Sequence, residues 1–252
     1  MPRLMVVLAG LIGMAAVAAA QPPAVLTVFA ASDLGFAFHE LVPRFERAFG
    51  VKVTLVLGST GNLARQIEHG APADLFFAAD ETFVDRLVAG GTLIAETRTR
   101  YAQGRLVLAT AQTAGPKLTD LGQLLDARVR RVAIANPVHA PYGRAAREAL
   151  TTGGLWDAVQ PKLVYGENIR QTLQYVQTGA VDAGIVARSI ADVPEIEWVP
   201  IDPNLHQPLN QAAAVVRRSP HPQLGLSFIH FLNGPEERAI MKRYGFRLPG
   251  EL

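Results

Sequence analysis

The chain has 252 residues, of which 49% are hydrophobic and 18% charged, so it is not a disordered polypeptide and it can bury a sizeable core. Its 24 Lys and Arg residues nearly balance 22 Asp and Glu residues without a long run of one sign, which excludes a nucleic-acid-binding footprint. The absence of cysteine excludes a disulfide framework, a thiol nucleophile, a cysteine-ligated metal and a lipidated N-terminal cysteine.

Residues 1–20 have the pattern of a secretory signal peptide. Arg3 supplies a basic start, residues 4–17 are apolar apart from glycines, and three alanines precede Gln21. The alternative is a membrane anchor, but the apolar run is shorter than the roughly 20 residues that span a bilayer. We therefore expect cleavage after Ala20 and export of the mature chain to the periplasm.

From residue 25 on, short β-type runs alternate with amphipathic helical stretches, which predicts an α/β fold with mostly parallel sheets and helices on both faces. The predicted strands are residues 26–30, 51–57, 74–79, 106–109, 132–135, 163–165, 184–186 and 212–216. The predicted helices are residues 34–49 with a kink at Pro43, 63–69, 81–89, a segment around 224–231, and 235–243.

Four predicted strands end in a short run of small or polar residues that opens directly into a helix. These runs are residues 31–33, 58–62, 136–143 and 166–168. In open α/β sheets ligands bind at the carboxyl ends of the strands, and a helix N-terminus there attracts anions through its unpaired N–H groups. Glycines at 58 and 61 allow close backbone approach, and Ser59 and Thr60 add hydroxyl donors. Together the four runs predict an anion site made of neutral donors.

Each of these runs has a simpler alternative. Ser, Thr, Asp and Asn before a helix are common N-caps, and glycine between strand and helix is ordinary. However, the chain contains no G-x-S-x-G elbow, no H-E-x-x-H motif and no Walker lysine motif, so nothing in it indicates catalysis. Its six histidines are scattered without helical ligand spacing, and we expect no metal-cation site and no cofactor.

Four segments carry a resemblance to a known family: residues 27–32 (TVFAAS), 58–67 (GSTGNLARQI), 70–76 (GAPADLF) and 242–246 (KRYGF). Together they resemble the periplasmic molybdate-binding proteins of ABC transporters, over nearly all of the mature chain. The resemblance implies a type II periplasmic-binding-protein fold, in which two lobes of mixed, mostly parallel sheet flanked by helices close on a ligand. We expect one lobe at residues 21–105 with 212–252, and the other at 106–211.

The resemblance also implies the ligand-binding positions, which are Ser32, Asp33, Ser59, Thr60, Tyr142 and Ile169. Relatives usually have Ser or Asn where this chain has Asp33. Because a carboxylate repels a dianion, we expect Asp33 to offer its backbone N–H and to turn its side chain away. Many relatives have a tyrosine where this chain has Ala187, so we expect Tyr142 to supply that hydroxyl; the alternative is a packing tyrosine at the cleft edge.

The function implied is capture of molybdate or tungstate and delivery to an ABC permease, by a monomer. Neutral donors suit a fully deprotonated dianion, so affinity is expected to vary little with pH. Sulfate carries the same charge and is expected to be excluded by size. Nearby arginines are expected to be surface or supporting charges rather than ligands: Arg65, Arg144, Arg170 and Arg188. The alternatives are a binding protein for sulfate, phosphate or a metal cation, and an exported α/β hydrolase.

Overall fold

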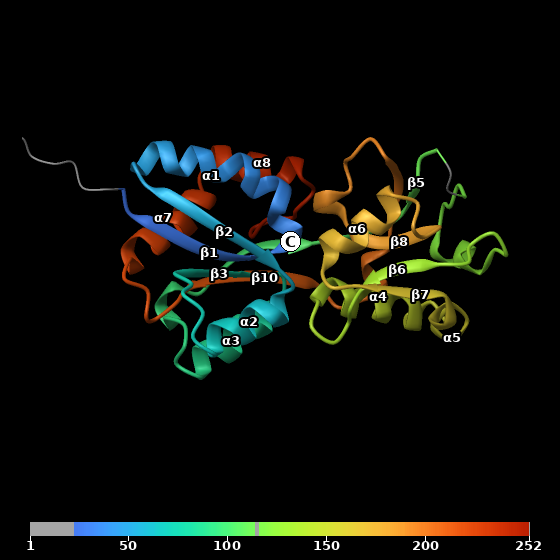
Figure 1. The fold of residues 1–252 in the computed structure, drawn as a ribbon, viewed down its shortest axis with the longest axis horizontal. Helices are drawn as coiled ribbons and strands as arrows, with labels where there is room; N and C mark the ends of the chain where they lie inside the picture. The colour runs from blue at the N-terminus through green and yellow to red at the C-terminus, as the bar shows by residue number, and fades with distance from the viewer. Residues whose placement is uncertain (1–22, 114–115, 252) are drawn as a thin grey trace, which may run out of the picture.

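The computed structural model describes residues 23–113 and 116–251, which form two α/β lobes side by side (Figure 1). The predicted signal peptide and the cleavage point after Ala20 lie outside the described residues. Within the described ranges, no helix is both long enough and apolar enough to cross a membrane. Each lobe is built around one five-stranded mixed sheet, as the sequence predicts.

The first lobe contains the sheet ordered β2-β1-β3-β10-β4. Its strands are β1 (Val25–Ala31), β2 (Lys52–Gly58), β3 (Leu75–Ala78), β4 (Thr99–Gly104) and β10 (Leu209–Val215). One face is covered by α1 (Gly35–Phe49), α7 (Pro222–Leu232) and α8 (Pro235–Arg243), and the other by α2 (Thr60–Glu68) and α3 (Glu81–Ala89). Strands β1 and β3 are almost wholly buried because helices cover both faces, which explains their near-continuous apolar sequence.

The second lobe contains the sheet ordered β7-β6-β8-β5-β9. Its strands are β5 (Leu106–Ala111), β6 (Val132–Ala135), β7 (Leu163–Gly166), β8 (Ala183–Ala187) and β9 (Ile196–Pro200). Its longer helices, on opposite faces in Figure 1, are α4 (Pro141–Thr152) and α6 (Ile169–Gln177), with the short α5 (Trp156–Val159) beyond them. Strands β6, β7 and β8 are parallel, so the loops that follow β6 and β7 meet at one edge of the sheet.

The chain crosses between the lobes twice. It leaves the first sheet at the end of β4 and enters the second at Leu106, and it returns after β9 to begin β10 at Leu209. The sequence predicts lobe boundaries at 105/106 and 211/212, and the crossings lie at residue 105 and at residues 201–208. The strand β10 begins before residue 212 because Leu209 and Gln211 pair with β4, a strand that the sequence analysis did not identify.

Two strands were missed, and both run antiparallel to their neighbours at the edge of a sheet. β4 reads Thr-Arg-Tyr-Ala-Gln-Gly and β9 reads Ile-Glu-Trp-Val-Pro, so neither has the continuous apolar run by which the central strands were found. The predicted helix around Pro43 is present as α1, which continues through the proline to Phe49.

Candidate functional site

All six residues expected at the ligand site line one cavity between the two lobes. We call it the cleft cavity, and its lining residues are Ala31, Ser32, Asp33, Gly58, Ser59, Thr60, Ala79, Ala140, Pro141, Tyr142 and Ile169. The six expected residues are all buried, and the free space between them is only about 10 Å³. The lobes are therefore in contact with one another here, and the cavity has room for little more than one water molecule.

Three helix N-termini converge on the cleft cavity. Thr60 is the first residue of α2, Ile169 is the first residue of α6, and Tyr142 follows Pro141 at the start of α4. The N–H groups of these first-turn residues have no acceptor within their own helices, and each helix end carries about half a positive charge. Their convergence creates a positive, donor-rich cavity without a lysine or arginine in its lining.

A simple N-cap role explains the polar residue before α6 but not the one before α2. The Asn168 side chain caps α6, because its Oδ1 accepts hydrogen bonds from the N–H groups of Arg170 and Gln171. Ser59 stands in the same position before α2 but makes no capping bond. The Ser59 hydroxyl contacts His139 instead, which leaves the α2 N-terminus without a side-chain cap.

Ser59 and His139 join the lobes across the cavity. Ser59 Oγ lies 2.8 Å from His139 Nδ1, and the Gly61 N–H donates to the His139 carbonyl over 2.9 Å. A Cβ added at Gly61 would lie 2.7 Å from that carbonyl oxygen, so only glycine allows this approach. In the tautomer with the proton on Nδ1, His139 donates to Ser59 and leaves the serine hydrogen free to reach an anion.

Asp33 is completely buried, and its carboxylate is held by two donors. Oδ2 accepts hydrogen bonds from the Tyr142 hydroxyl at 2.9 Å and from Gln211 Nε2 at 2.7 Å. The other oxygen, Oδ1, has no hydrogen-bond partner among the described residues. Burial raises the pKa of Asp33 from 3.8 to about 6, although the bonds from Gln211 and Tyr142 oppose this shift.

The bond to Asp33 determines what Tyr142 can offer to a ligand. A phenol has one hydrogen, and while Asp33 is ionised that hydrogen is used on the carboxylate. When Asp33 is protonated, the carboxylic acid can donate to the tyrosine oxygen, and the tyrosine hydrogen is released. Tyr142 can thus donate elsewhere only when Asp33 is protonated, a condition that neither the donor interpretation nor the packing alternative included.

Further contacts tie the lobes together around the cavity. Ser189 Oγ donates to the Asp33 carbonyl over 2.9 Å, and Arg144 pairs with Asp80. Arg144 therefore has the supporting role expected of it rather than a place in the cavity lining. Because these bonds must break when the lobes part, they favour the closed arrangement that buries the site.

Three residues that shape the site were not identified from the sequence. Gln211 is buried in β10 and bridges the Tyr101 hydroxyl to Asp33. His139 has no ligand spacing to another histidine in the sequence, and no motif marks Gly104. A Cβ at Gly104 would meet the Tyr142 hydroxyl, so the absence of a side chain there makes room for the tyrosine. In the sequence, Gln211 is marked only as a polar residue that directly precedes the predicted apolar strand at residues 212–216.

The hydrolase alternative finds one supporting contact. His139 Nε2 lies 3.6 Å from Glu167 Oε2, so a serine, a histidine and an acid follow one another from Ser59 to Glu167. The contact between His139 and Glu167 is longer than a hydrogen bond, and the Glu167 side chain is more than half exposed. No group of three or more His, Asp or Glu side chains placed to hold a metal ion occurs among the residues that the structure describes.

Comparison with known proteins places the chain in a family. The family model for bacterial extracellular solute-binding proteins matches residues 26–247. The chain belongs to this family. A molybdate-binding protein from Azotobacter vinelandii is 35% identical over 98% of this chain and 97% of its own length.

Solved structures agree with this placement. The periplasmic molybdate-binding protein of Azotobacter vinelandii superposes with a TM-score of 0.82 at 31% identity, covering 89% of this chain and 99% of that one. A sulfate-binding protein from Mycobacterium tuberculosis has a TM-score of 0.76 at 18% identity, covering 90% of this chain and 87% of that one. This second likeness shows the fold alone, so the fold does not decide which anion is bound.

Proposed function

We propose that this solute-binding protein captures molybdate, and tungstate with it, and delivers the anion to an ABC permease. The observation that carries the proposal is the convergence of Ser32, Ser59, Thr60, Tyr142 and Ile169 on one buried cavity at three helix N-termini. The molybdate-binding relatives, at 31–35% identity over most of both chains, support this choice of anion.

The donor set fits a fully deprotonated tetrahedral dianion. Molybdate and tungstate carry no proton to donate near neutral pH, so they bind only through N–H and O–H donors. The helix N-termini and the hydroxyls of Ser32, Ser59 and Thr60 provide such donors in a cavity shielded from water. A smaller dianion leaves some donors short of an acceptor, at a cost of about 1 to 3 kcal/mol each, which disfavours sulfate.

Lobe closure links capture to transport. The site residues are buried, so the lobes part about the two crossings to admit the anion and close again through the contacts of His139 with Ser59 and Gly61. Closure brings the surfaces of both lobes into one fixed arrangement. A permease that binds both lobes can thereby distinguish the loaded from the open protein.

Asp33 makes this capture proton-dependent, which replaces the expectation of a flat pH profile. That expectation assumed neutral donors only, whereas the Asp33 carboxyl, with a pKa of about 6, accepts the hydrogen of Tyr142, a lining residue of the cavity. A bound dianion repels an ionised Asp33 and needs the hydrogen that Tyr142 otherwise gives to it. Binding therefore favours protonated Asp33, and affinity rises as the pH falls towards 6.

Calorimetry on residues 21–252 with molybdate, tungstate and sulfate tests the proposal. We expect one site per chain, tight binding of molybdate and tungstate, and sulfate binding at least about 100-fold weaker, the equivalent of two poorly made contacts. Sulfate binding as tight as molybdate binding would overturn the proposal.

The hydrolase alternative is tested by the same residue that serves binding. We propose that the protein is not an enzyme, so Ser59→Ala is expected to weaken molybdate binding and to leave no ester or phosphate turnover to lose. A turnover by the purified protein that Ser59→Ala abolishes would instead support catalysis by the Ser59, His139 and Glu167 series.

The place of action follows from the leader and the family. Extracellular solute-binding relatives support an extracytoplasmic carrier. We propose that cleavage after Ala20 releases it and that it acts as a monomer. N-terminal sequencing of the exported protein is expected to begin at Gln21. Sedimentation is expected to give one chain per particle, and an intact leader or a dimer would contradict this part of the proposal.

A further inference from the structure

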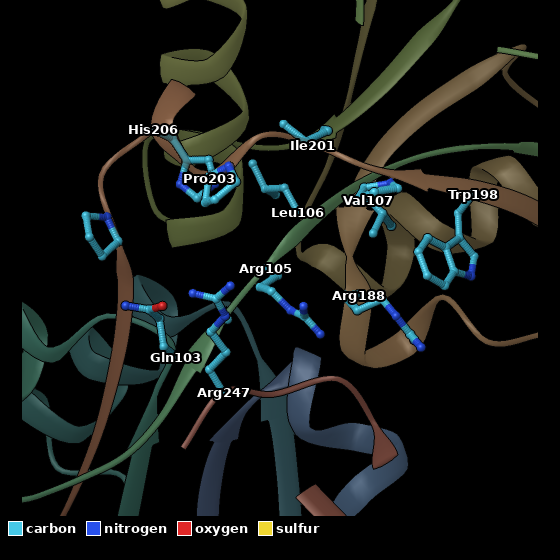
Figure 2. A pocket seen from close by; sticks show the side chains of 13 residues that line it. Gln103, Arg105, Leu106, Val107, Arg188, Trp198, Ile201, Pro203, His206 and Arg247 are labelled. Atoms are coloured by element: carbon cyan, nitrogen blue, oxygen red, sulfur yellow. The ribbon is translucent and has the colours of Figure 1, made fainter. Parts of the chain in front are cut away.

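A second and larger pocket lies on the hinge side of the molecule (Figure 2). We call it the hinge pocket; it has a volume of about 560 Å³ and is lined by residues of both chain crossings and of the C-terminal segment. Residues 103–107 come from the first crossing, residues 200–208 from the second, and Arg247 from the C-terminal segment. None of its lining residues belongs to the cleft cavity, so the two pockets are separate.

Three arginines face this pocket from different segments. Arg105 lies between β4 and β5, Arg188 follows β8, and Arg247 follows α8. Figure 2 shows their side chains along one side of the pocket. No Asp or Glu is among the lining residues, which leaves the pocket with an excess of positive charge.

The charge of these arginines is only partly balanced. Arg188 pairs with Asp192 at 2.8 Å, while Arg105 Nε donates to the Gly245 carbonyl at 3.1 Å, a neutral acceptor. Arg247 has no salt bridge with any acid of the described residues. Partial burial of the otherwise exposed Arg105 lowers its pKa, and so do the nearby charges of Arg247 and Arg188.

The opposite side of the pocket is apolar. Leu106, Val107 and Ile201 are buried side chains of this wall, and prolines extend it. Trp198 closes one end, where the Arg188 guanidinium stacks 4.3 Å from the centre of its ring. A pocket with an apolar wall and a few convergent charges is typical of small-molecule sites.

We propose that the hinge pocket binds a small organic anion, with its carboxylate, sulfonate or phosphate head between Arg105 and Arg247 and its apolar body against Leu106 and Ile201. Guanidinium groups suit this head because they donate paired hydrogen bonds to planar or tetrahedral oxyanions. An inorganic oxyanion lacks the body that would cover the apolar wall, so the pocket differs in ligand class from the cleft.

A ligand in this pocket contacts both lobes at once. Gln103 and Arg247 belong to the first lobe, whereas Val107, Arg188 and Trp198 belong to the second. When the lobes part about the two crossings, the distances between these groups change. We therefore expect a ligand in the hinge pocket to change the affinity of the cleft cavity for its anion, and the anion to change the affinity of the hinge pocket by the same factor.

The test is calorimetric titration of residues 21–252 with naphthalene-2-sulfonate, whose charge does not change with pH. The titration is made with saturating molybdate present, and 2-naphthol serves as the uncharged match. We expect saturable binding of one sulfonate per chain, at least about tenfold tighter than naphthol. Arg247→Gln is expected to weaken it about tenfold, the loss of one charged hydrogen-bond partner.

Arg130→Gln is the matched control, because Arg130 is an exposed arginine outside the pocket lining. It is expected to leave sulfonate binding unchanged. Arg105→Gln provides a second variant, and thermal melting checks that each variant folds. Equal binding of naphthol, equal binding by Arg247→Gln and the parent, or no binding at all would overturn the proposal. Loss of molybdate binding alone would affect the cleft proposal and not this one.

Discussion

The cleft cavity and the hinge pocket bind negative charge by opposite means. The cleft cavity is buried, has about 10 Å³ of free space and uses helix N-termini and hydroxyls, with one acid, Asp33, in its wall. The hinge pocket has about 560 Å³ and uses arginines, of which Arg105 and Arg247 are exposed. A buried arginine would carry a large desolvation penalty in an unliganded cleft, whereas oriented dipoles carry a small one. Full charges therefore lie where solvent reaches them, and dipoles lie where it does not.

The largest expected effect concerns the stability of the protein and the buried acid of the cleft. Burial raises the pKa of Asp33 from 3.8 to about 6, so the folded state holds this proton more tightly than the unfolded chain. The associated stability is complete below about pH 4 and is lost as the pH rises through about 6. Asp33→Asn cannot ionise, and its free energy of unfolding relative to the parent is expected to rise by up to about 3 kcal/mol across this window.

Urea unfolding at several pH values measures this difference. Asp157→Asn, at an exposed acid, is the control and is expected to show no such trend. A pH-independent difference between Asp33→Asn and the parent would mean that Asp33 keeps an ordinary pKa despite its burial.

The next effect tests whether the cleft works only when closed. Gly61→Ala places a Cβ about 2.7 Å from the His139 carbonyl oxygen, so the lobes must separate at that point. We expect molybdate affinity to fall about 100-fold, the equivalent of two lost contacts, while sulfonate binding in the hinge pocket changes less.

Calorimetry with both ligands measures the effect of Gly61→Ala. Gly90→Ala is its control, because a Cβ there meets only ordinary contacts at 3.5 Å or more. Unchanged molybdate affinity in Gly61→Ala would show that the Gly61 contact is not part of ligand closure.

A smaller effect separates the two pockets by pH. Above the pKa of about 6, binding of a dianion beside Asp33 takes up a proton, so molybdate affinity is expected to fall by up to about 50-fold between pH 6 and 8. The guanidinium groups that hold the sulfonate stay charged over this range, so sulfonate affinity in the hinge pocket is expected to change much less than molybdate affinity.

Titrations of the parent and Asp33→Asn at three pH values measure this contrast. The variant is expected to give a flat molybdate profile, and Tyr142→Phe a shallower one, because it lacks the hydrogen that Asp33 competes for. A steep profile that persists in Asp33→Asn would show that a group other than Asp33 takes up the proton.

The smallest effect is the response to salt. The cleft cavity is buried, so raising sodium chloride from about 50 to 500 mM is expected to change molybdate affinity less than about threefold. Arg105 and Arg247 are exposed, and sulfonate affinity is expected to fall about tenfold over the same range. Equal salt responses, measured by calorimetry, would remove the distinction between dipoles and full charges.

Central strands and helices were predictable from local patterns. Strand β6 and helix α8 begin and end where the sequence analysis expected, because an apolar run and a Pro-started amphipathic stretch specify them locally. The edge strands β4 and β9 were missed, since half-exposed edges carry mixed sequences. The four strand-to-helix runs predicted one anion site, whereas the six individual residues were named only through the resemblance to a family.

The partners of those residues depend on contacts between distant segments. Ser59 and His139, Asp33 and Gln211, and Asp33 and Tyr142 each come from segments far apart in the chain. No local pattern indicates that Ser59 contacts a histidine rather than capping its helix. The same holds for Arg188, which was expected to be a surface or supporting charge and which lines the hinge pocket.

The sequence by itself determined an α/β chain with polar turns before its helices, and it predicted an export signal and an anion site, because these follow from local spacing and composition. Only the tertiary structure decided which hydroxyls are free to donate, why the affinity should depend on a proton, and where the arginines gather. Burial and hydrogen-bond direction arise when segments from both lobes meet, and they control the pKa of Asp33 and the single hydrogen of Tyr142.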